Sequence, residues 1–377
     1  MRVGVIHNLQ PGGAHRRMSE QISRFGSEVV EVCLGTATPV SGDAHVVNYR
    51  PRAPKVARAV RPPLRYTDFV ALLRVWRKAA NMLRGLDVDV VYANPCRYLQ
   101  SPAALLERVA PSLYFCDEPR RVDHDPAAKG SRNPATGPVY WPLHAAERRL
   151  DRWGVACATR LATNSSFTAR EIERAYGRDA EVIPLGAAEL WSGAPARAPE
   201  HILSVGALIP SKGHDLAISA AGRAAVKWPV LVVAPTPAAS EAERLRAIAG
   251  KAGVELTIRT GISDAELAGA YGAAQATLYM AEREPFGLAS LEAQAAGSPV
   301  IVSAEGGLPE TIEEGRTGWA VPRNGEAVSS KLDQLEVPGV RDSFAAAARA
   351  HASAASWSAS SAAVESILRE LCRQPQS

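Results

Sequence analysis

The sequence is poor in cysteine and lacks any long apolar run. Its five cysteines are scattered and never spaced as Cys-x-x-Cys, which argues against a disulfide framework or a structural zinc site and favours a reducing, cytoplasmic compartment. No stretch reaches the roughly 18 consecutive apolar residues that a membrane span needs. No apolar segment with a cleavage site follows the N-terminus, so we expect no signal peptide.

An excess of charge of one sign is also lacking. The 43 basic and 39 acidic residues give a formal net charge of +4, which is too balanced to indicate a nucleic-acid-binding protein. Hydrophobic residues make up 46% and charged residues 22% of the chain, which excludes a disordered chain, a collagen-like fibre and a coiled coil. The length of 377 residues favours two domains of ordinary size.

Short apolar runs, bounded by turn residues, alternate with helical patterns along the whole chain. This alternation predicts an α/β protein of two Rossmann-like, doubly wound domains that face a central cleft, with ligands at the carboxyl ends of the strands. We place the domains at residues 1–187 and 188–356, joined by a Gly-, Ala- and Pro-rich linker at 186–199, with a C-terminal helix in 357–377 packing back on the first domain. The expected strands are residues 2–6, 28–33, 88–92, 112–116, 160–164 and 181–185, then 202–205, 230–234, 256–259, 276–279 and 300–302.

Residues 69–83 form an amphipathic stretch with basic side chains around it. One interpretation is a helix that lies on a membrane surface, which would give a weak membrane contact. The other, which we favour, is a packing helix with a solvated basic face.

The richest chemistry lies in residues 282–310. Glu284 and Glu292 are eight positions apart, with Pro285 and Gly287 between them and a helix predicted over 287–296. The first turn of such a helix offers unpaired backbone N–H groups to an anion, and carboxylates accept hydrogen bonds from the hydroxyls of a polyol. The plain alternative is two solvated glutamates beside a core helix.

At these residues the sequence resembles the family-four retaining glycosyltransferases of the GT-B class. The resemblance covers nearly the whole chain and is densest over residues 202–320. Glu284 and Glu292 match the family's E-x7-E element, with Phe286, Gly287 and Leu288 in place. The resemblance implies that Glu284 contacts the donor sugar and that Glu292 holds the nucleotide ribose. Further matches are Gly306-Gly307, Thr317-Gly318 and residues 264–271.

Residues 204–213 resemble the family's diphosphate-binding turn. Lys212 matches the family lysine, whereas Ala207 stands where the family carries an arginine that would neutralise the diphosphate. Arg16 and Arg17, in the loop expected after the first strand, are candidate replacements. Gly12 and Gly13 in that loop match the glycine turn that faces the donor phosphates, and the nucleobase is expected near Arg259.

The segment that begins at Cys116 resembles a family segment in which a histidine lies near the reacting sugar. Here that position is Asp117, which we retain as a catalytic candidate with Lys212 and Glu284. Residues 118–141 are predicted to line the acceptor side. The acceptor-binding candidates are Glu118, Arg120, His124 and Arg16. Residues 164–170 also resemble the family and are read as a strand end and a helix cap.

The resemblance implies no cofactor and no essential metal. The pairs Asp87/Asp89 and Asp123/Asp125 have the spacing of a metal-binding DxD motif, but that spacing is common by chance. The expected partners are a nucleotide-diphosphate sugar donor and a small-molecule or glycan acceptor, without nucleic acid. No feature sets an oligomeric state.

Three other functions remain open from the sequence. A sugar-nucleotide epimerase would share the architecture and would convert the donor without an acceptor. A catalytically impaired sugar-nucleotide-binding protein is suggested by Ala207 and Asp117. A dinucleotide-dependent oxidoreductase is disfavoured because no Gly-x-Gly-x-x-Gly follows the first strand.

Overall fold

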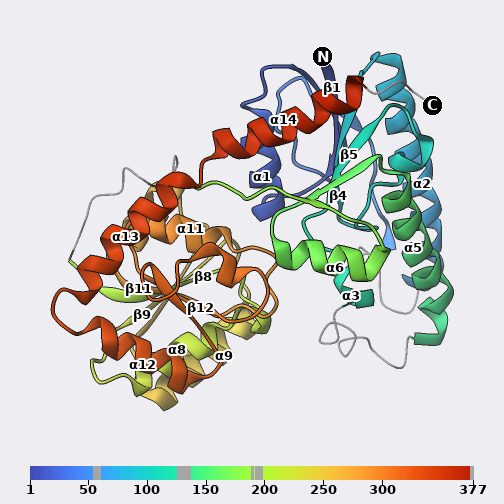
Figure 1. Ribbon diagram of the computed structural model, residues 1–377. Coiled ribbons are helices and arrows are strands. Elements are labelled where there is room, and N and C mark those ends of the chain that lie inside the picture. Colours follow the sequence, from blue (N-terminus) through green and yellow to red (C-terminus); the bar gives the residue numbers. More distant parts are fainter. Residues whose placement is uncertain (54–60, 125–136, 188–190, 192–197, 374–377) are drawn as a thin grey trace. The chain divides into compact units, whose positions relative to one another are not determined.

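The computed structural model describes residues 1–53, 61–124, 137–187, 191 and 198–373, which form two compact units (Figure 1). Unit 1 comprises Met1–Asn164, Thr168–Ile183 and Ser360–Ser377, and unit 2 comprises Ser165–Phe167 and Pro184–Ala359. The chain therefore passes from one unit to the other between residues 183 and 184. Most of the predicted linker at 186–199 lies outside the described residues.

Unit 1 is built on a seven-stranded sheet in the order β3-β2-β1-β4-β5-β6-β7, in which every paired strand is parallel. Its strands are β1 (Arg2–Asn8), β2 (Glu28–Leu34), β3 (His45–Val47), β4 (Val90–Cys96), β5 (Ser112–Phe115), β6 (Arg160–Thr163) and β7 (Glu181–Val182). Its helical elements are α1 (Gly13–Ile22), α2 (Arg61–Gly85), η3 (Ala103–Glu107), α3 (Arg121–His124), α5 (Gly137–Cys157) and most of α6 (Ser166–Tyr176).

Helix α2 packs on this sheet through a stripe of apolar residues at helical spacing, including Leu72, Trp76 and Leu83, all of them buried. A side chain at Gly4 of β1 would place its Cβ 2.8 Å from Leu83 Cδ2, so the helix approaches the strand closely where the residue is glycine. The apolar side of α2 thus belongs to the core, as the packing interpretation predicts.

The last helix, α14 (Trp357–Arg373), contributes residues 360–373 to unit 1. Gln21 of α1 donates a hydrogen bond from Nε2 to Ser360 Oγ over 3.0 Å, and its backbone carbonyl accepts one from Ser361 Oγ over 2.8 Å. The carboxylate of Glu365 accepts hydrogen bonds from Gly26 N and Ser27 Oγ.

Unit 2 carries a six-stranded sheet in the order β10-β9-β8-β11-β12-β13, again with parallel pairs only. Its strands are β8 (His201–Val205), β9 (Val230–Ala234), β10 (Leu256–Thr260), β11 (Ala274–Tyr279), β12 (Val300–Ser303) and β13 (Gly318–Val321). Helix α8 packs between α9 and α12, and α11 packs between α10 and α13. The helical elements are η5 (Pro210–Lys212), α8 (His214–Arg223), α9 (Ala239–Ala252), α10 (Asp264–Gly272), α11 (Leu288–Ala295), η6 (Leu308–Thr311), α12 (Gly325–Leu335) and α13 (Val340–Ala354).

Each sheet reverses its strand order once, between β1 and β4 in unit 1 and between β8 and β11 in unit 2. In doubly wound sheets the ligand crevice lies at this reversal, outside the carboxyl ends of the strands. The loops that follow these four strands are therefore where function is expected.

The predicted fold class is confirmed, and the sequence prediction differs from the structure in a few elements. Strands β3 and β13 were not predicted, and the strand expected over 181–185 is only the two residues of β7. Arg16 and Arg17, expected in a loop, lie inside α1. Within the described ranges, no helix combines the length and apolar character that crossing a membrane requires.

Candidate functional site

Lys212 lies in the tight turn between β8 and α8 of unit 2. Gly213 follows it with φ of 72°, a conformation that glycine adopts without strain. An added Cβ at Gly213 would lie 2.3 Å from the carbonyl oxygen of Met280, just past the end of β11. Only glycine lets the Lys212 turn approach the β11 loop this closely, so the two loops at the strand reversal support each other.

Lys212 and Glu284 come together in these loops. Lys212 Nζ lies 2.7 Å from Glu284 Oε2, and the two side chains are 20% and 16% exposed. Tyr279, the last residue of β11, donates a hydrogen bond from its hydroxyl to Glu284 Oε1 over 3.0 Å. The Lys212 Nζ atom also lies 3.5 Å from the Tyr279 hydroxyl oxygen. An ammonium group, a carboxylate and a phenol thus contact one another at a site with little exposure to solvent.

Tyr279 was missed by the sequence analysis. A tyrosine that ends an apolar strand is typical of a core residue, and Tyr279 is in fact 5% exposed. The one available signal was its position at the carboxyl end of the strand next to the reversal, where side chains reach the ligand crevice.

The Gly306-Gly307 turn fixes the backbone of the Glu284 loop. Gly307 N donates a hydrogen bond to the Glu284 carbonyl over 2.7 Å. Added Cβ atoms would lie 2.4 Å from the Glu284 carbonyl oxygen at Gly306 and 2.2 Å from the Pro285 carbonyl oxygen at Gly307. Two adjacent glycines are therefore needed because backbone packs directly on backbone here.

Helix α11 begins beside this cluster. Gly287 precedes the helix with φ of 116°, Leu288 is its first residue, and Phe286 is buried just before it. Glu292 lies one turn inside the helix, 6% exposed, and accepts a hydrogen bond from the Tyr271 hydroxyl over 3.1 Å. The first amides of α11 and the buried carboxylate of Glu292 are thus held on one short, well-packed helix.

His214 supports the turn that contains Ala207. Its Nε2 lies 3.1 Å from the Ala207 carbonyl oxygen and its Nδ1 lies 2.8 Å from Ser204 Oγ. Burial lowers the pKa of His214, which favours the neutral ring. A neutral ring that donates from Nε2 and accepts at Nδ1 satisfies both contacts.

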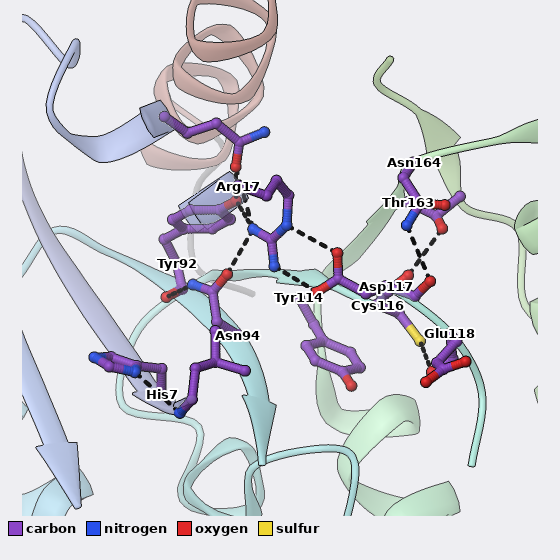
Figure 2. A network of polar contacts seen from close by, with 12 residues as sticks. His7, Arg17, Tyr92, Asn94, Tyr114, Cys116, Asp117, Glu118, Thr163 and Asn164 are labelled. Carbon is purple, nitrogen blue, oxygen red and sulfur yellow. Dashed lines mark hydrogen bonds and ion pairs between the residues drawn. The ribbon is translucent and has the colours of Figure 1, made fainter. Parts of the chain in front are cut away.

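Unit 1 has its own polar network at the carboxyl ends of its strands (Figure 2). Arg17 of α1 forms a two-pronged ion pair with Asp117, just past β5, with Nε–Oδ1 and Nη2–Oδ2 distances of 2.9 and 2.7 Å. Arg17 also donates from Nη1 to Tyr92 Oη and to Asn94 Oδ1, each over 2.8 Å. Its guanidinium carbon lies 3.9 Å from the centre of the Phe115 ring.

This network corrects the suggestion that Arg17 replaces the missing family arginine at position 207. The Arg17 side chain is completely buried and its donors already serve Asp117, Tyr92 and Asn94. Burial raises the pKa of Tyr92, so its phenol stays protonated. Arg17 therefore fixes Asp117 in place rather than offering a charge to a ligand.

The other predicted acceptor-side residues lie in unit 1 and carry contacts of their own. Arg120 pairs with Asp123 over 2.8 Å and with Glu147, and Glu118 pairs with Arg121. The His124 ring meets the Tyr176 ring edge-on at 5.7 Å. Residues 125–136 of the predicted acceptor segment, including Asp125, lie outside the described residues.

Four further predicted positions can be placed. Gly12 precedes α1 and Gly13 begins it, and Arg16 lies half-buried in its first turns. Arg259 lies on the edge strand β10 and is exposed. Its Nη2 atom lies 2.6 Å from Oε1 of Glu266 in α10. The contacts described above do not join Arg259 to Lys212 and Glu284.

Comparison with known proteins decides the family. The model of Glycosyltransferase Family 4 matches residues 11–188, and the model of Glycosyl transferases group 1 matches residues 190–351. The chain belongs to the family-four glycosyltransferases. The two matches follow one another along the chain and together leave only the chain ends and residue 189 unmatched.

Curated relatives of this family-four chain include two D-inositol 3-phosphate glycosyltransferases. The protein of Acidothermus cellulolyticus is 33% identical over 229 residues, which are 54% of this chain and 51% of the relative. The protein of Streptomyces bingchenggensis is 30% identical over 247 residues, which are 58% of this chain and 54% of the relative. The chain thus spans about half the length of the curated relatives that it matches.

Solved structures share the fold at low sequence identity. Sucrose-phosphate synthase from Thermosynechococcus elongatus has a TM-score of 0.75 at 18% identity and covers 98% of this chain and 99% of its own. Anabaena Alr3699/HepE, solved in complex with UDP, has a TM-score of 0.75 at 15% identity and covers 98% of this chain and 100% of its own. These neighbours confirm the predicted GT-B fold of this family-four chain.

One group of possible metal ligands occurs in the part of the chain that the structure describes: His7, Glu31 and Cys33. His7 Nε2 lies 2.9 Å from Glu31 Oε1, and the Glu31 carboxylate also accepts hydrogen bonds from the backbone N–H groups of Val40 and Ser41. Burial raises the pKa of Cys33 to about 12, so its thiol stays protonated. These hydrogen bonds connect Glu31 of β2 to His7 of β1 and to the loop at Val40 and Ser41, which is consistent with a structural role.

Proposed function

We propose that this protein is a retaining glycosyltransferase that moves a sugar from a nucleotide-diphosphate sugar to a hydroxyl or amine of a small-molecule or glycan acceptor. One observation carries the proposal: Lys212, Glu284 and Tyr279 meet at the strand reversal of unit 2, beside the first turn of α11. A cation and helix amides suit a diphosphate, and a carboxylate suits sugar hydroxyls. Family membership supports the same assignment.

The donor binds unit 2 in this proposal. The diphosphate is held by Lys212 and the first amides of α11, the sugar by Glu284, and the ribose by Glu292. Carboxylates accept hydrogen bonds only, so Glu284 and Glu292 select ligands rich in hydroxyl groups. The nucleobase is proposed to lie near Arg259. No metal and no cofactor is required in this scheme.

The acceptor binds unit 1, where Asp117 and the candidates Glu118, Arg120, His124 and Arg16 lie. Asp117 accepts hydrogen bonds from Arg17 and keeps further acceptor capacity on its oxygens for a substrate hydroxyl. The names of the curated relatives make a phosphorylated polyol the first acceptor to test.

The reaction proceeds with retention of configuration. The bond between the anomeric carbon and the leaving phosphate oxygen breaks while the acceptor oxygen or nitrogen bonds to the same face of the sugar. The departing phosphate oxygen takes the acceptor's proton. Lys212 and the α11 amides stabilise the charge that develops on the leaving diphosphate, the kind of electrostatic contribution that dominates many enzymatic accelerations.

Arg323 is the cation that we propose in place of the missing arginine at position 207. Its Nε donates a hydrogen bond to the Met280 carbonyl over 3.0 Å, the same carbonyl against which Gly213 packs. Its guanidinium thereby stays beside the Lys212 turn, and only a long 3.9 Å contact ties it to Glu282.

The test begins with a thermal-shift screen of nucleotide-diphosphate sugars, because a ligand that binds the folded state raises the melting temperature. The donor that binds is then incubated with polyol acceptors, and NMR of the product reads the anomeric configuration. A product with the donor's configuration is expected; an inverted product would refute the mechanism. Conversion of the donor alone to an isomer would instead support the epimerase, which the comparisons do not favour.

A further inference from the structure

The solvent-facing side of α2 carries four exposed basic residues, whereas its one acidic residue is half-buried. The exposed cations are Arg74, Arg77, Lys78 and Arg84. Asp68 is the one acid in the sequence of α2, and its carboxylate is occupied by the backbone N–H groups of Arg52 and Ala53, each at 2.9 Å from Oδ2. Four exposed cations between residues 74 and 84 thus stand against a single acid within the helix, at position 68.

Helix α5 presents a similar outer side, with tryptophan added. Its exposed residues include Arg148, Arg149 and Arg152. Trp141 is 68% exposed and Trp153 is 56% exposed, the largest values among the exposed large hydrophobic residues of the described chain. Both acids of α5, Glu147 and Asp151, are buried. Arg149 and Trp153 are four residues apart, so they lie on the same side of the helix.

The two helices adjoin in unit 1. Tyr66 of α2 donates a hydrogen bond to the Val139 carbonyl of α5 over 2.8 Å, and the Arg65 guanidinium carbon lies 4.9 Å from the centre of the Tyr140 ring. Figure 1 shows α2 and α5 along the same side of unit 1. Glu107 of η3 pairs with Arg77 over 2.9 Å and with Arg84 over 3.6 Å.

We propose that this surface docks on an anionic membrane. Its centre, here called the basic face, consists of Arg74, Lys78, Trp141, Arg149, Arg152 and Trp153. The four cations of the basic face form no ion pair with the acids that the structure describes, so their charge can match that of phospholipid headgroups. Tryptophan favours the boundary between headgroup and acyl chain. The proposal concerns the solvent side of α2, whereas the apolar side of the same helix packs in the core.

The exposed apolar side chains favour a bilayer over a nucleic acid. Val70 and Met82 on the outer side of α2 are 45% and 36% exposed, in addition to the two tryptophans. A nucleic acid would engage the cations, and unpaired bases could stack on tryptophan, but it would leave Val70 and Met82 in water. In a bilayer they enter the headgroup region along with the basic residues.

Flotation of the full chain with phospholipid vesicles tests the proposal. The protein should float with vesicles of equimolar phosphatidylcholine and phosphatidylglycerol and remain behind with phosphatidylcholine alone. Each basic residue near an anionic surface contributes about fivefold to binding, so Arg149→Glu with Arg152→Glu should weaken partitioning on the order of a hundredfold. Trp141→Ser with Trp153→Ser should weaken it as well and should remove the fluorescence blue shift that vesicles cause.

A matched control is Arg246→Glu with Lys251→Glu on α9, where two exposed cations are reversed by the same charge change in unit 2. This variant should still float. The proposal is wrong if the parent protein does not bind the anionic vesicles, if both charge-reversed variants bind alike, or if an RNA or DNA oligonucleotide binds while vesicles do not. An unchanged melting temperature identifies each variant as folded. Donor binding is measured separately by thermal shift, so failure here leaves the proposed glycosyl transfer intact.

Discussion

The Nζ atom of Lys212 lies 2.7 Å from Oε2 of Glu284, although the two residues are 72 positions apart in the chain. Each belongs to a loop that follows one of the two strands flanking the reversal of the unit 2 sheet. The ion pair keeps both side chains ordered before any ligand arrives. A diphosphate that approaches Lys212 would compete with Glu284 for the ammonium group, and Tyr279 would keep the carboxylate in place.

Lys212→Ala and Glu284→Ala should each lower turnover at least about a hundredfold, as the loss of a group that stabilises developing charge does in other enzymes. Steady-state kinetics with the identified donor measures this. Lys251→Ala, at an exposed position of α9, serves as the control and should retain the parent rate. Near-parental rates in both site variants would refute the assignment of the donor site.

Tyr279→Phe removes only the hydroxyl that donates to Glu284 Oε1. Hydrogen bonds to charged groups contribute about 1.5–3 kcal/mol, so turnover should fall about tenfold or more while the ring still fills its place. The melting temperature should fall by several degrees and no more, because the ring still packs in its place. A large loss of stability with unchanged turnover would show that the hydroxyl serves packing instead.

Gly306→Ala and Gly307→Ala should both destabilise unit 2 and disturb the Glu284 loop, because each new Cβ would meet a backbone carbonyl at 2.4 Å or less. Thermal denaturation and donor binding measure the two effects. Gly250→Ala is the control: this glycine lies within α9 with no neighbouring atom in reach of a Cβ. It should leave stability equal or slightly raised, since alanine favours a helix over glycine by about 1 kcal/mol.

The sequence predicted the sheets well because buried parallel strands read as continuous apolar runs, as at residues 230–234. It missed β3 and β13 because three or four residues, among them Gly318, carry too little pattern. The glutamate pair and Lys212 were predicted from the family motif. The direct contact between Lys212 and Glu284 was not predicted, because it depends on which strands are neighbours in the sheet.

Arg17 shows why burial of charge is hard to predict from sequence. With Arg16 it was predicted as a loop cation that could neutralise the donor diphosphate, yet its side chain is fully buried. Its partner Asp117 is 100 positions away, on the loop after another strand. Nothing local to either residue indicates the pairing.

Arg17→Met should destabilise the protein by about 3–5 kcal/mol, because it leaves the carboxylate of Asp117 largely buried without its partner. Urea denaturation measures this. Arg17→Met combined with Asp117→Leu should recover most of the loss, since no charge then remains in the network. Arg174→Met, which breaks an exposed pair with Glu171, should cost less than about 1 kcal/mol. A double variant as unstable as the single one would argue against charge burial as the cause.

Stability should fall as the pH drops below the ordinary histidine pKa of 6.5, because burial lowers the pKa of His7, His201, His214 and His351 in the folded chain. Between the folded and unfolded pKa values the unfolded chain binds more protons, and protons then favour unfolding. Melting temperatures at about pH 7.5 and about pH 5.5 bracket this window. His214→Asn should reduce the difference between the two temperatures, whereas His45→Asn, at an exposed position, should leave it unchanged. A stability that rises toward pH 5.5 would contradict the lowered pKa of these four rings.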